Sequence, residues 1–241
     1  MPAENRARFA TTHWSVVLAA ADSASPRATA ALADLCGTYW YPVYTFIRRS
    51  GHSADDARDL TQAFFTRLLE KGWLADARPD RGRFRAFLLT ALRHFLSNER
   101  EWRNAVKRGG GNQLLSLEFE DGERRYQIEP VDSATPDRLY ERRWARAALE
   151  AAMKRLERQQ ETEGRRRLFD RLRPLLTGDD PATSYQALAV ELTMSEGALR
   201  VAVHRLRRQF AAALRATIAE TVATEEEVVD ELRYLLDVMR G

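Results

Sequence analysis

The sequence predicts an all-α protein with two helical domains joined by a linker. Apolar residues recur at helical spacing in most of the chain, N-capping residues and glycines mark the ends of these segments, and one long polar stretch lacks any such period. Only 12 Gly and 8 Pro among 241 residues argue against a loop-rich β-sandwich. The predicted parts are a first domain (1–108), a linker (109–136), a second domain (137–219) and an acidic C-terminal helix (220–241).

The first predicted helix begins at Ser25 and Pro26, a favourable N-cap and N1 pair, and ends at Gly51. Pro42 lies inside this helix and is expected to kink or divide it, because proline lacks the N–H that the helix needs there.

The second predicted helix begins at Ser53 and ends at Gly72. Ser53 and Asp56 have capping-box spacing, and acidic residues crowd the first turn, where the helix dipole favours them.

A third helix is expected from about Arg83 to Arg103, with one face for packing and the other for solvent or a ligand. The polar face carries Thr90, Arg93, Ser97 and Arg100. The apolar face carries Phe84, Leu88, Leu92, Phe95 and Trp102.

The second domain is expected to hold helices over about 136–160 and 163–176, followed by a helix-turn-helix. Its first helix opens with a capping box of Thr183 and Gln186, and its second helix has Ser195 as N-cap after the turn 193–195. The expected buried residues are Tyr185, Leu188, Ala189 and Leu192 on the first helix and Leu199, Val203, Leu206 and Phe210 on the second. Gly197, Val201, His204, Arg205 and Arg208 are expected to face outward.

Charge is distributed unevenly, and lysine is rare. Only Lys71, Lys107 and Lys154 are lysines, so arginine supplies 35 of the 38 basic side chains. The segment 81–108 has a net charge of +6, 195–215 has +4, and 220–241 has −5. Arginine suits phosphate and guanine edges better than lysine, so this distribution is compatible with nucleic acid.

Catalytic and metal-binding patterns are missing from the sequence. The four histidines are scattered, Cys36 is the single cysteine, and Gly109–Gly111 is not followed by the Lys-Ser/Thr of a phosphate loop. The first-turn acids at 55, 56 and 59 favour helix capping and an acidic surface over a cation site. We therefore expect no metal, no cofactor and no enzymatic activity. No apolar run has the length of a membrane span or a signal peptide, so a cytoplasmic location is expected.

Three segments together resemble the extracytoplasmic-function (ECF) RNA polymerase sigma factors of the sigma-70 family. The first half of sigma region 2 is similar to YPVYTFIRRSGHSADDARDLTQAFFTRLLEK, and its promoter-melting half to RGRFRAFLLTALRHFLSNEREWRNAVKR. Sigma region 4 is similar to SYQALAVELTMSEGALRVAVHRLRRQFAAALR, including its S-E-G-A opening and H-R-L-R ending. The order of the segments and the linker between them also match.

This resemblance implies a specificity subunit that recruits core RNA polymerase to promoters and opens them, with polymerisation left to the core. The first domain would dock on the clamp coiled coil of the β′ subunit, and the second domain would hold the β flap. The implied docking residues are Asp55, Asp56, Asp59, Gln62 and Phe65. The implied contacts to the −10 element are Arg83, Arg85, Arg93, His94, Arg100 and Arg103, and those to the −35 element are Ser195, Glu196, Gly197, Arg200, Val201, His204, Arg205 and Arg208.

The sequence departs from the family pattern in the docking helix. Members commonly carry acids where this chain has Arg58 and Ala63, and a Trp and an Asn where it has Phe87 and His94. Losing two carboxylates should weaken docking on a basic coiled coil. Because some ECF groups with similar departures use kinases, phosphorylation of Thr61, which would add about −1.5 to −2 charges, is one hypothesis for restoring it. The alternative is that Thr61 is an ordinary helix residue.

The acidic C-terminal helix leaves two roles open. Val228, Leu232, Leu235 and Met239 form an apolar stripe that would either pack against the second domain or fold over its DNA-reading face. An anti-sigma factor is a further partner that such a protein would have. The alternative to a sigma factor is a stand-alone helix-turn-helix regulator that binds duplex DNA without polymerase. A helical RNA-binding or nuclease-like protein is less well supported, because no catalytic cluster is present.

Overall fold

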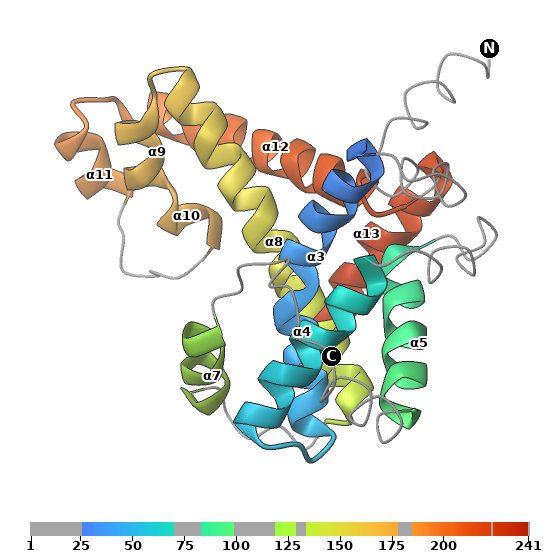
Figure 1. The fold of residues 1–241 in the computed structure, drawn as a ribbon. Helices are drawn as coiled ribbons and strands as arrows, with labels where there is room; N and C mark the ends of the chain where they lie inside the picture. The colour runs from blue at the N-terminus through green and yellow to red at the C-terminus, as the bar shows by residue number, and fades with distance from the viewer. Residues whose placement is uncertain are drawn as a thin grey trace, which may run out of the picture. The chain divides into compact units, whose positions relative to one another are not determined.

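A computed structural model describes residues 26–69, 83–98, 119–128, 134–177, 185–222 and 224–240 (Figure 1). Within these ranges the regular elements are helices, and the one β feature is an isolated antiparallel bridge between Arg83 and Val222. The prediction of a helical protein is therefore confirmed for the described ranges. The predicted helix-terminal residues Ser25, Gly72 and Thr183, together with Trp102, lie outside them.

The chain divides into two compact units. The first unit comprises residues 1–147 and 218–241, and the second comprises 148–217. This division differs from the expected boundary at 137, because the first part of α8 belongs to the first unit. The helices are α3 (Pro26–Arg49), α4 (Ala54–Leu69), α5 (Phe84–Ser97), α7 (Phe119–Ile128), α8 (Pro136–Thr162), α9 (Arg166–Leu172), α10 (Pro174–Thr177), α11 (Tyr185–Glu191), α12 (Glu196–Ala219) and α13 (Glu225–Arg240).

The helix α3 runs unbroken through Pro42, so the predicted division at this residue does not occur. The hydroxyl of Thr45 donates to the Pro42 carbonyl at 3.0 Å one turn later. The helix ends before Gly51, whose φ of +96° is a backbone conformation that residues with a Cβ rarely adopt.

The predicted cap of α4 is confirmed. Ser53 Oγ accepts the backbone N–H of Asp56 at 3.1 Å and donates to the Asp56 carboxylate at 2.9 Å. This pair satisfies a backbone donor at the start of the helix and fixes the first turn, in which Asp55 also lies.

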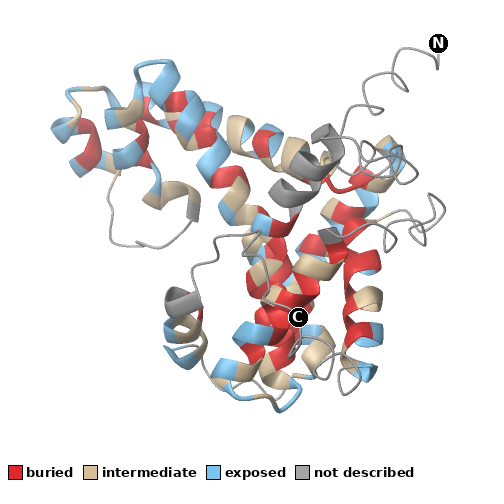
Figure 2. Ribbon diagram, in the orientation of Figure 1, coloured by how far each residue is buried: buried red, intermediate tan, exposed pale blue. Residues whose placement is uncertain are grey.

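Aromatic side chains fill the core of the first unit, and buried residues run along α4 and α5 (Figure 2). The Tyr39 and Phe84 rings pack edge-to-face with their centroids 4.8 Å apart. The Phe64 and Phe95 rings pack in the same way with their centroids 5.5 Å apart. The buried Trp144 donates its indole N–H to the Tyr39 hydroxyl at 3.0 Å. The predicted apolar face of the third helix, Phe84, Leu88, Leu92 and Phe95, is buried as expected.

The predicted linker contains a helix that the periodicity of the sequence did not reveal. In α7, the Glu123 carboxylate accepts a hydrogen bond from Tyr44 and two from the Arg48 guanidinium at 3.1 Å, which tie α7 to α3. Beside it, Gly122 lies against Trp40, where an added Cβ would come within 2.7 Å of the ring. The helix α7 is held by these polar contacts and by the close approach of Gly122 to Trp40. Because no apolar stripe holds it, the periodicity of the sequence did not predict it.

Glu123 should make the stability of the first unit depend on pH. Burial opposes its ionisation, but hydrogen bonds from Tyr44, Arg48 and Gln127 outweigh burial and keep the pKa of Glu123 below its ordinary value of 4.5. The contribution is then fully present above pH 4.5 and is lost as the pH falls through the lower folded-state pKa.

Glu123→Gln is therefore expected to cost about 1–2 kcal/mol of unfolding free energy at pH 7. Its deficit relative to wild type should shrink as the pH falls below 4.5, measured by urea unfolding at several pH values. The control is Glu226→Gln, on the exposed surface of α13. A deficit that stayed constant over this range would contradict the assignment.

Candidate nucleic-acid interface

The turn between α11 and α12 has a defined backbone geometry. The N–H of Met194 donates to the Ala189 carbonyl at 2.9 Å and that of Thr193 to the Val190 carbonyl at 3.1 Å, which is the bonding pattern of a Schellman helix end. Thr193 takes a φ of +54° at the position that usually holds glycine. Ser195 then caps α12 as predicted, its Oγ accepting the N–H of Ala198 at 3.2 Å.

The two helices are positioned by a shared core in the second unit. The apolar residues predicted for the helix-turn-helix lie in this core: Leu188 and Ala189 of α11 and Leu199, Val203 and Leu206 of α12 are buried, and Tyr185, Leu192 and Phe210 pack against them. The same cluster contains Ala152, Met153 and Leu156 of α8 and Phe169 and Leu172 of α9. The orientation of α12 is thereby fixed by its packing against α8, α9 and α11.

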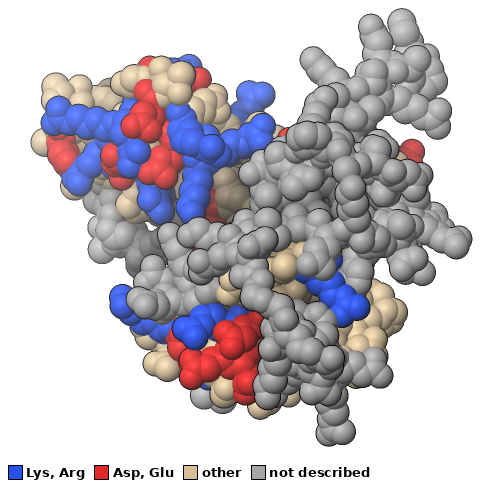
Figure 3. Space-filling view, viewed as in Figure 1, with Lys and Arg blue, Asp and Glu red and all other residues tan. Residues whose placement is uncertain are grey.

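The apolar residues of α12 pack into this core and leave the opposite face of the helix open. Every residue predicted to contact the −35 element is exposed. Val201 is 60% exposed on this face. Arg200 lies 3.7 Å from Glu196 and over the Tyr185 ring at 5.4 Å. Arg205 and Arg208 have no acidic partner among the described residues. Figure 3 shows basic side chains interleaved with acidic ones over the second unit.

The strained turn gives a prediction about stability. Asparagine tolerates the left-handed conformation better than the β-branched threonine, so Thr193→Asn is expected to raise the unfolding free energy by about 0.5–1 kcal/mol. Ser195→Ala, which removes the cap two residues later, should lower it by about 1 kcal/mol. Thermal unfolding of the two variants measures both changes. A Thr193→Asn protein that melted below wild type would show that the threonine makes a favourable contact in the turn.

The residues expected at the −10 element have different surroundings. Arg93 and His94 are exposed on α5, and Arg93 pairs with Asp137. Arg83 is 29% exposed and lies 3.5 Å from the Asp230 carboxylate of α13. Arg85 does not fit the expectation, because its side chain is buried. Arg100 and Arg103 lie outside the described residues.

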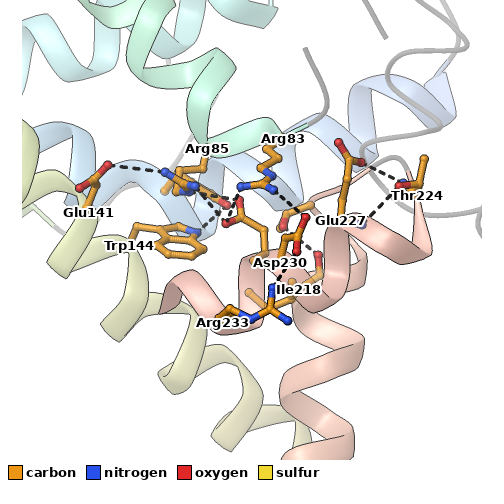
Figure 4. Close-up of polar contacts among 12 residues, drawn as sticks. Arg83, Arg85, Glu141, Trp144, Ile218, Thr224, Glu227, Asp230 and Arg233 are labelled. Carbon is orange, nitrogen blue, oxygen red and sulfur yellow. Dashed lines mark hydrogen bonds and ion pairs between the residues drawn. The ribbon is translucent and has the colours of Figure 1, made fainter. Parts of the chain in front are cut away.

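Arg85 is held by a cluster of side chains from α8 and α13 (Figure 4). Its guanidinium donates to both carboxylate oxygens of Glu231, at 3.1 and 3.0 Å, and lies 3.6 Å from Glu141. It lies over the rings of both Trp144 and Tyr234, at 4.8 and 4.2 Å from their centroids. Burial opposes the charge of Arg85, but the hydrogen bonds to Glu231 outweigh it and raise its pKa. Burial and the neighbouring Glu141 raise the pKa of Tyr234 to about 12, so this ring is neutral.

The acidic C-terminal helix belongs to the first unit, which differs from both roles expected for it. Its inward residues are Val228, Glu231 and Leu235, all buried, whereas Met239 of the expected stripe is 46% exposed. The buried face of α13 therefore differs from the predicted apolar stripe, because a carboxylate, Glu231, lies at its centre. In the sequence, Glu231 lies at helical spacing between the apolar residues Val228 and Leu235. From this position one could have inferred a buried carboxylate and, with it, a buried cationic partner.

The residues expected to dock on polymerase are only partly at the surface. The side chains of Asp55 and Asp59 are 91% and 77% exposed, Gln62 is half-buried, and Asp56 is engaged in the cap with Ser53. Phe65 is 1% exposed and contacts Phe64, so it is a core residue and cannot meet a partner in this conformation.

The structure also argues against Thr61 as a phosphorylation site. Its side chain is fully buried, and its hydroxyl donates to the Ala57 carbonyl at 2.6 Å within α4. In this conformation a kinase could not reach the hydroxyl, and a phosphoryl group would bring about −1.5 to −2 charges onto the packed face of α4. The burial and the hydrogen bond of Thr61 are those of an ordinary residue on the packed face of a helix.

The described ranges contain neither a metal-binding cluster nor a helix that could span a membrane. No group of His, Cys, Asp or Glu side chains there is arranged to hold a metal ion. None of the helices in these ranges has the length and apolar character needed to cross a membrane.

Comparisons with known proteins add no further evidence on function. No protein-family model matches the chain, and no match was found among curated proteins or among solved structures. The case for a function therefore depends on the residues and contacts of the chain itself.

Proposed function

We propose that this protein is a sigma factor of the ECF type, which binds bacterial core RNA polymerase and directs sequence-specific promoter recognition and transcription initiation. The observation that carries the proposal is the exposed basic face of α12. This helix is capped at Ser195, held by a core on one side, and exposes Arg200, His204, Arg205 and Arg208 on the other. A helix presented in this way fits the major groove, where arginines contact phosphates and guanine edges.

Docking on polymerase is supported by the exposed acids of α4. Asp55 and Asp59 lie at the surface beside Arg58, whose side chain is 52% exposed. A basic coiled coil such as the β′ clamp would be attracted by the carboxylates and repelled by the guanidinium. In this proposal the protein supplies specificity and the core enzyme supplies the chemistry.

The first experiment is co-elution of the purified protein with core RNA polymerase, followed by transcription from a promoter in the absence of other factors. Asp55→Asn with Asp59→Asn should weaken co-elution. Arg58→Glu, which places an acid where the resembled family commonly has one, should strengthen it. Asp237→Asn, a charge change on α13, is the control and should leave co-elution unchanged. Absence of co-elution for every variant would reject the proposal.

DNA reading by α12 is tested separately. Arg205→Ala is expected to weaken binding to duplex promoter DNA and to reduce the slope of log K against log salt by about 0.9, the value for one lost phosphate contact. Arg158→Ala, an exposed arginine of α8 in the same unit, is the matched control. Equal losses in both variants would indicate a nonspecific effect of positive charge.

A stand-alone helix-turn-helix regulator is the second candidate, and one observation favours it. Arg85 is buried and Arg83 is paired with α13, so the first unit offers fewer arginines to DNA than the resemblance implies. Specific duplex binding without any association with core polymerase would decide for this alternative.

A further inference from the structure

The contact between Arg85 and Glu231 has the geometry with which arginine binds phosphate. Arg85 Nε lies 3.1 Å from Glu231 Oε1, and a terminal nitrogen lies 3.0 Å from Oε2, so two N–H groups of the fork meet two oxygens of one anion. Carboxylates and phosphates are both recognised by this two-point geometry. Arg83 lies next to it, 3.9 Å from the same Glu231 carboxylate and 3.5 Å from Asp230.

The helix that carries the Glu231 carboxylate also places an aromatic ring against Arg85. Tyr234, one turn after Glu231 on α13, lies over the Arg85 guanidinium at 4.2 Å. Trp144 of α8 lies on the guanidinium at 4.8 Å, and its ring is 6.0 Å from that of Tyr234 at an angle of 40°. Arginine and tryptophan are also the surfaces on which unpaired bases of single-stranded nucleic acid stack.

From this geometry we infer that Arg83, Arg85 and Trp144 form a binding site for single-stranded DNA, and that α13 occupies this site as an internal substitute for the ligand. Glu231 takes the place of a phosphate, and Tyr234 takes the place of the adjoining base. The inference rests on the proposed function, since a protein that opens promoters must hold an unpaired strand.

The attachment of α13 is compatible with its release. The helix is anchored by Val228 and Leu235, whereas Leu236 and Met239 are 52% and 46% exposed. Release of α13 would return Glu231 to water and give Arg85 a phosphate in its place, so neither charge would be left buried without a partner. The segment 220–241 carries a net charge of −5, so DNA would repel α13 as it enters the site.

The test measures binding of a fluorescent single-stranded oligodeoxynucleotide to the full-length protein. Glu231→Gln keeps the shape of the side chain but removes its charge, and it is expected to tighten binding at least tenfold. The salt dependence should also steepen by about 0.7 for each phosphate gained. Asp237→Asn removes the same charge from an exposed position of α13 and should bind within twofold of wild type. Adding Arg85→Ala to Glu231→Gln should abolish the gain.

Hydrogen exchange of the wild-type protein provides a second measurement that does not depend on how well a variant folds. Adding the oligonucleotide should speed the exchange of backbone amides in 225–240. Equal binding by Glu231→Gln and Asp237→Asn, or unchanged exchange in 225–240 at saturating oligonucleotide, would overturn the inference. If either occurred while promoter-dependent initiation with core polymerase persisted, only this site would be rejected, and the proposed function would stand.

Discussion

Arg85→Met is expected to lower the free energy of unfolding by about 3–5 kcal/mol, because the Glu231 carboxylate would stay buried with only the more distant Arg83, 3.9 Å away, as a counter-charge. Glu231 is 1% exposed and Arg85 is 9% exposed, so water cannot replace the lost partner. Denaturant unfolding at neutral pH measures the change. The matched control is Arg83→Met, which removes a more exposed arginine with longer contacts of 3.5 and 3.9 Å and should cost about 1 kcal/mol or less.

A double-mutant cycle separates the ion pair from packing. Arg85→Met combined with Glu231→Leu replaces both charges by apolar groups and should recover most of the loss, since such replacements are often neutral or stabilising. The expected coupling energy between the two sites is at least about 2 kcal/mol. If the two single losses simply added, Arg85 would contribute through its stacking on Trp144 and Tyr234 and not through its charge.

Thr61→Glu is expected to destabilise the protein by about 3 kcal/mol or more, because it places an unpaired carboxylate in the core under α4. Thr61→Ser keeps the hydroxyl that donates to the Ala57 carbonyl and should cost much less. Far-ultraviolet circular dichroism during thermal unfolding would detect the difference.

The control on the same helix is Arg58→Glu, which introduces the same side chain at the surface and should change stability by less than about 1 kcal/mol. A Thr61→Glu protein as stable as wild type would mean that the face of α4 around Thr61 opens readily, and phosphorylation there would again be plausible.

Local signals in the sequence predicted the elements that depend on neighbouring residues. The cap of α4 at Ser53, the cap of α12 at Ser195 and the buried stripe from Leu199 to Leu206 are all confirmed. These features are set by hydrogen bonds within one turn and by helical spacing, both of which can be read from a short window of sequence.

Contacts between distant residues could not be predicted in this way. Arg85 has the spacing of a surface residue of α5, and only the arrival of Glu231, 146 positions later, turns it into a core residue. The family resemblance placed Phe65 among the docking residues and led to the Thr61 hypothesis, and neither inference takes account of the packing that buries both side chains of α4. The helix α7 was missed because polar groups, not a stripe of apolar residues, hold it to α3.

The bridge between Arg83 and Val222, with the Phe84 N–H donating to the Thr221 carbonyl at 3.0 Å, joins residues that leave the ribosome far apart in time. The second unit, 148–217, is inserted between the two parts of the first, so the first unit cannot be completed until the segment from 218 onward has been synthesised. At about 5–20 residues per second, the nascent first unit waits several seconds before Tyr234 of α13 can pack against Trp144. A chain that lacked α13 would leave Trp144 without its contact to Tyr234 and Arg85 without its hydrogen bonds to Glu231.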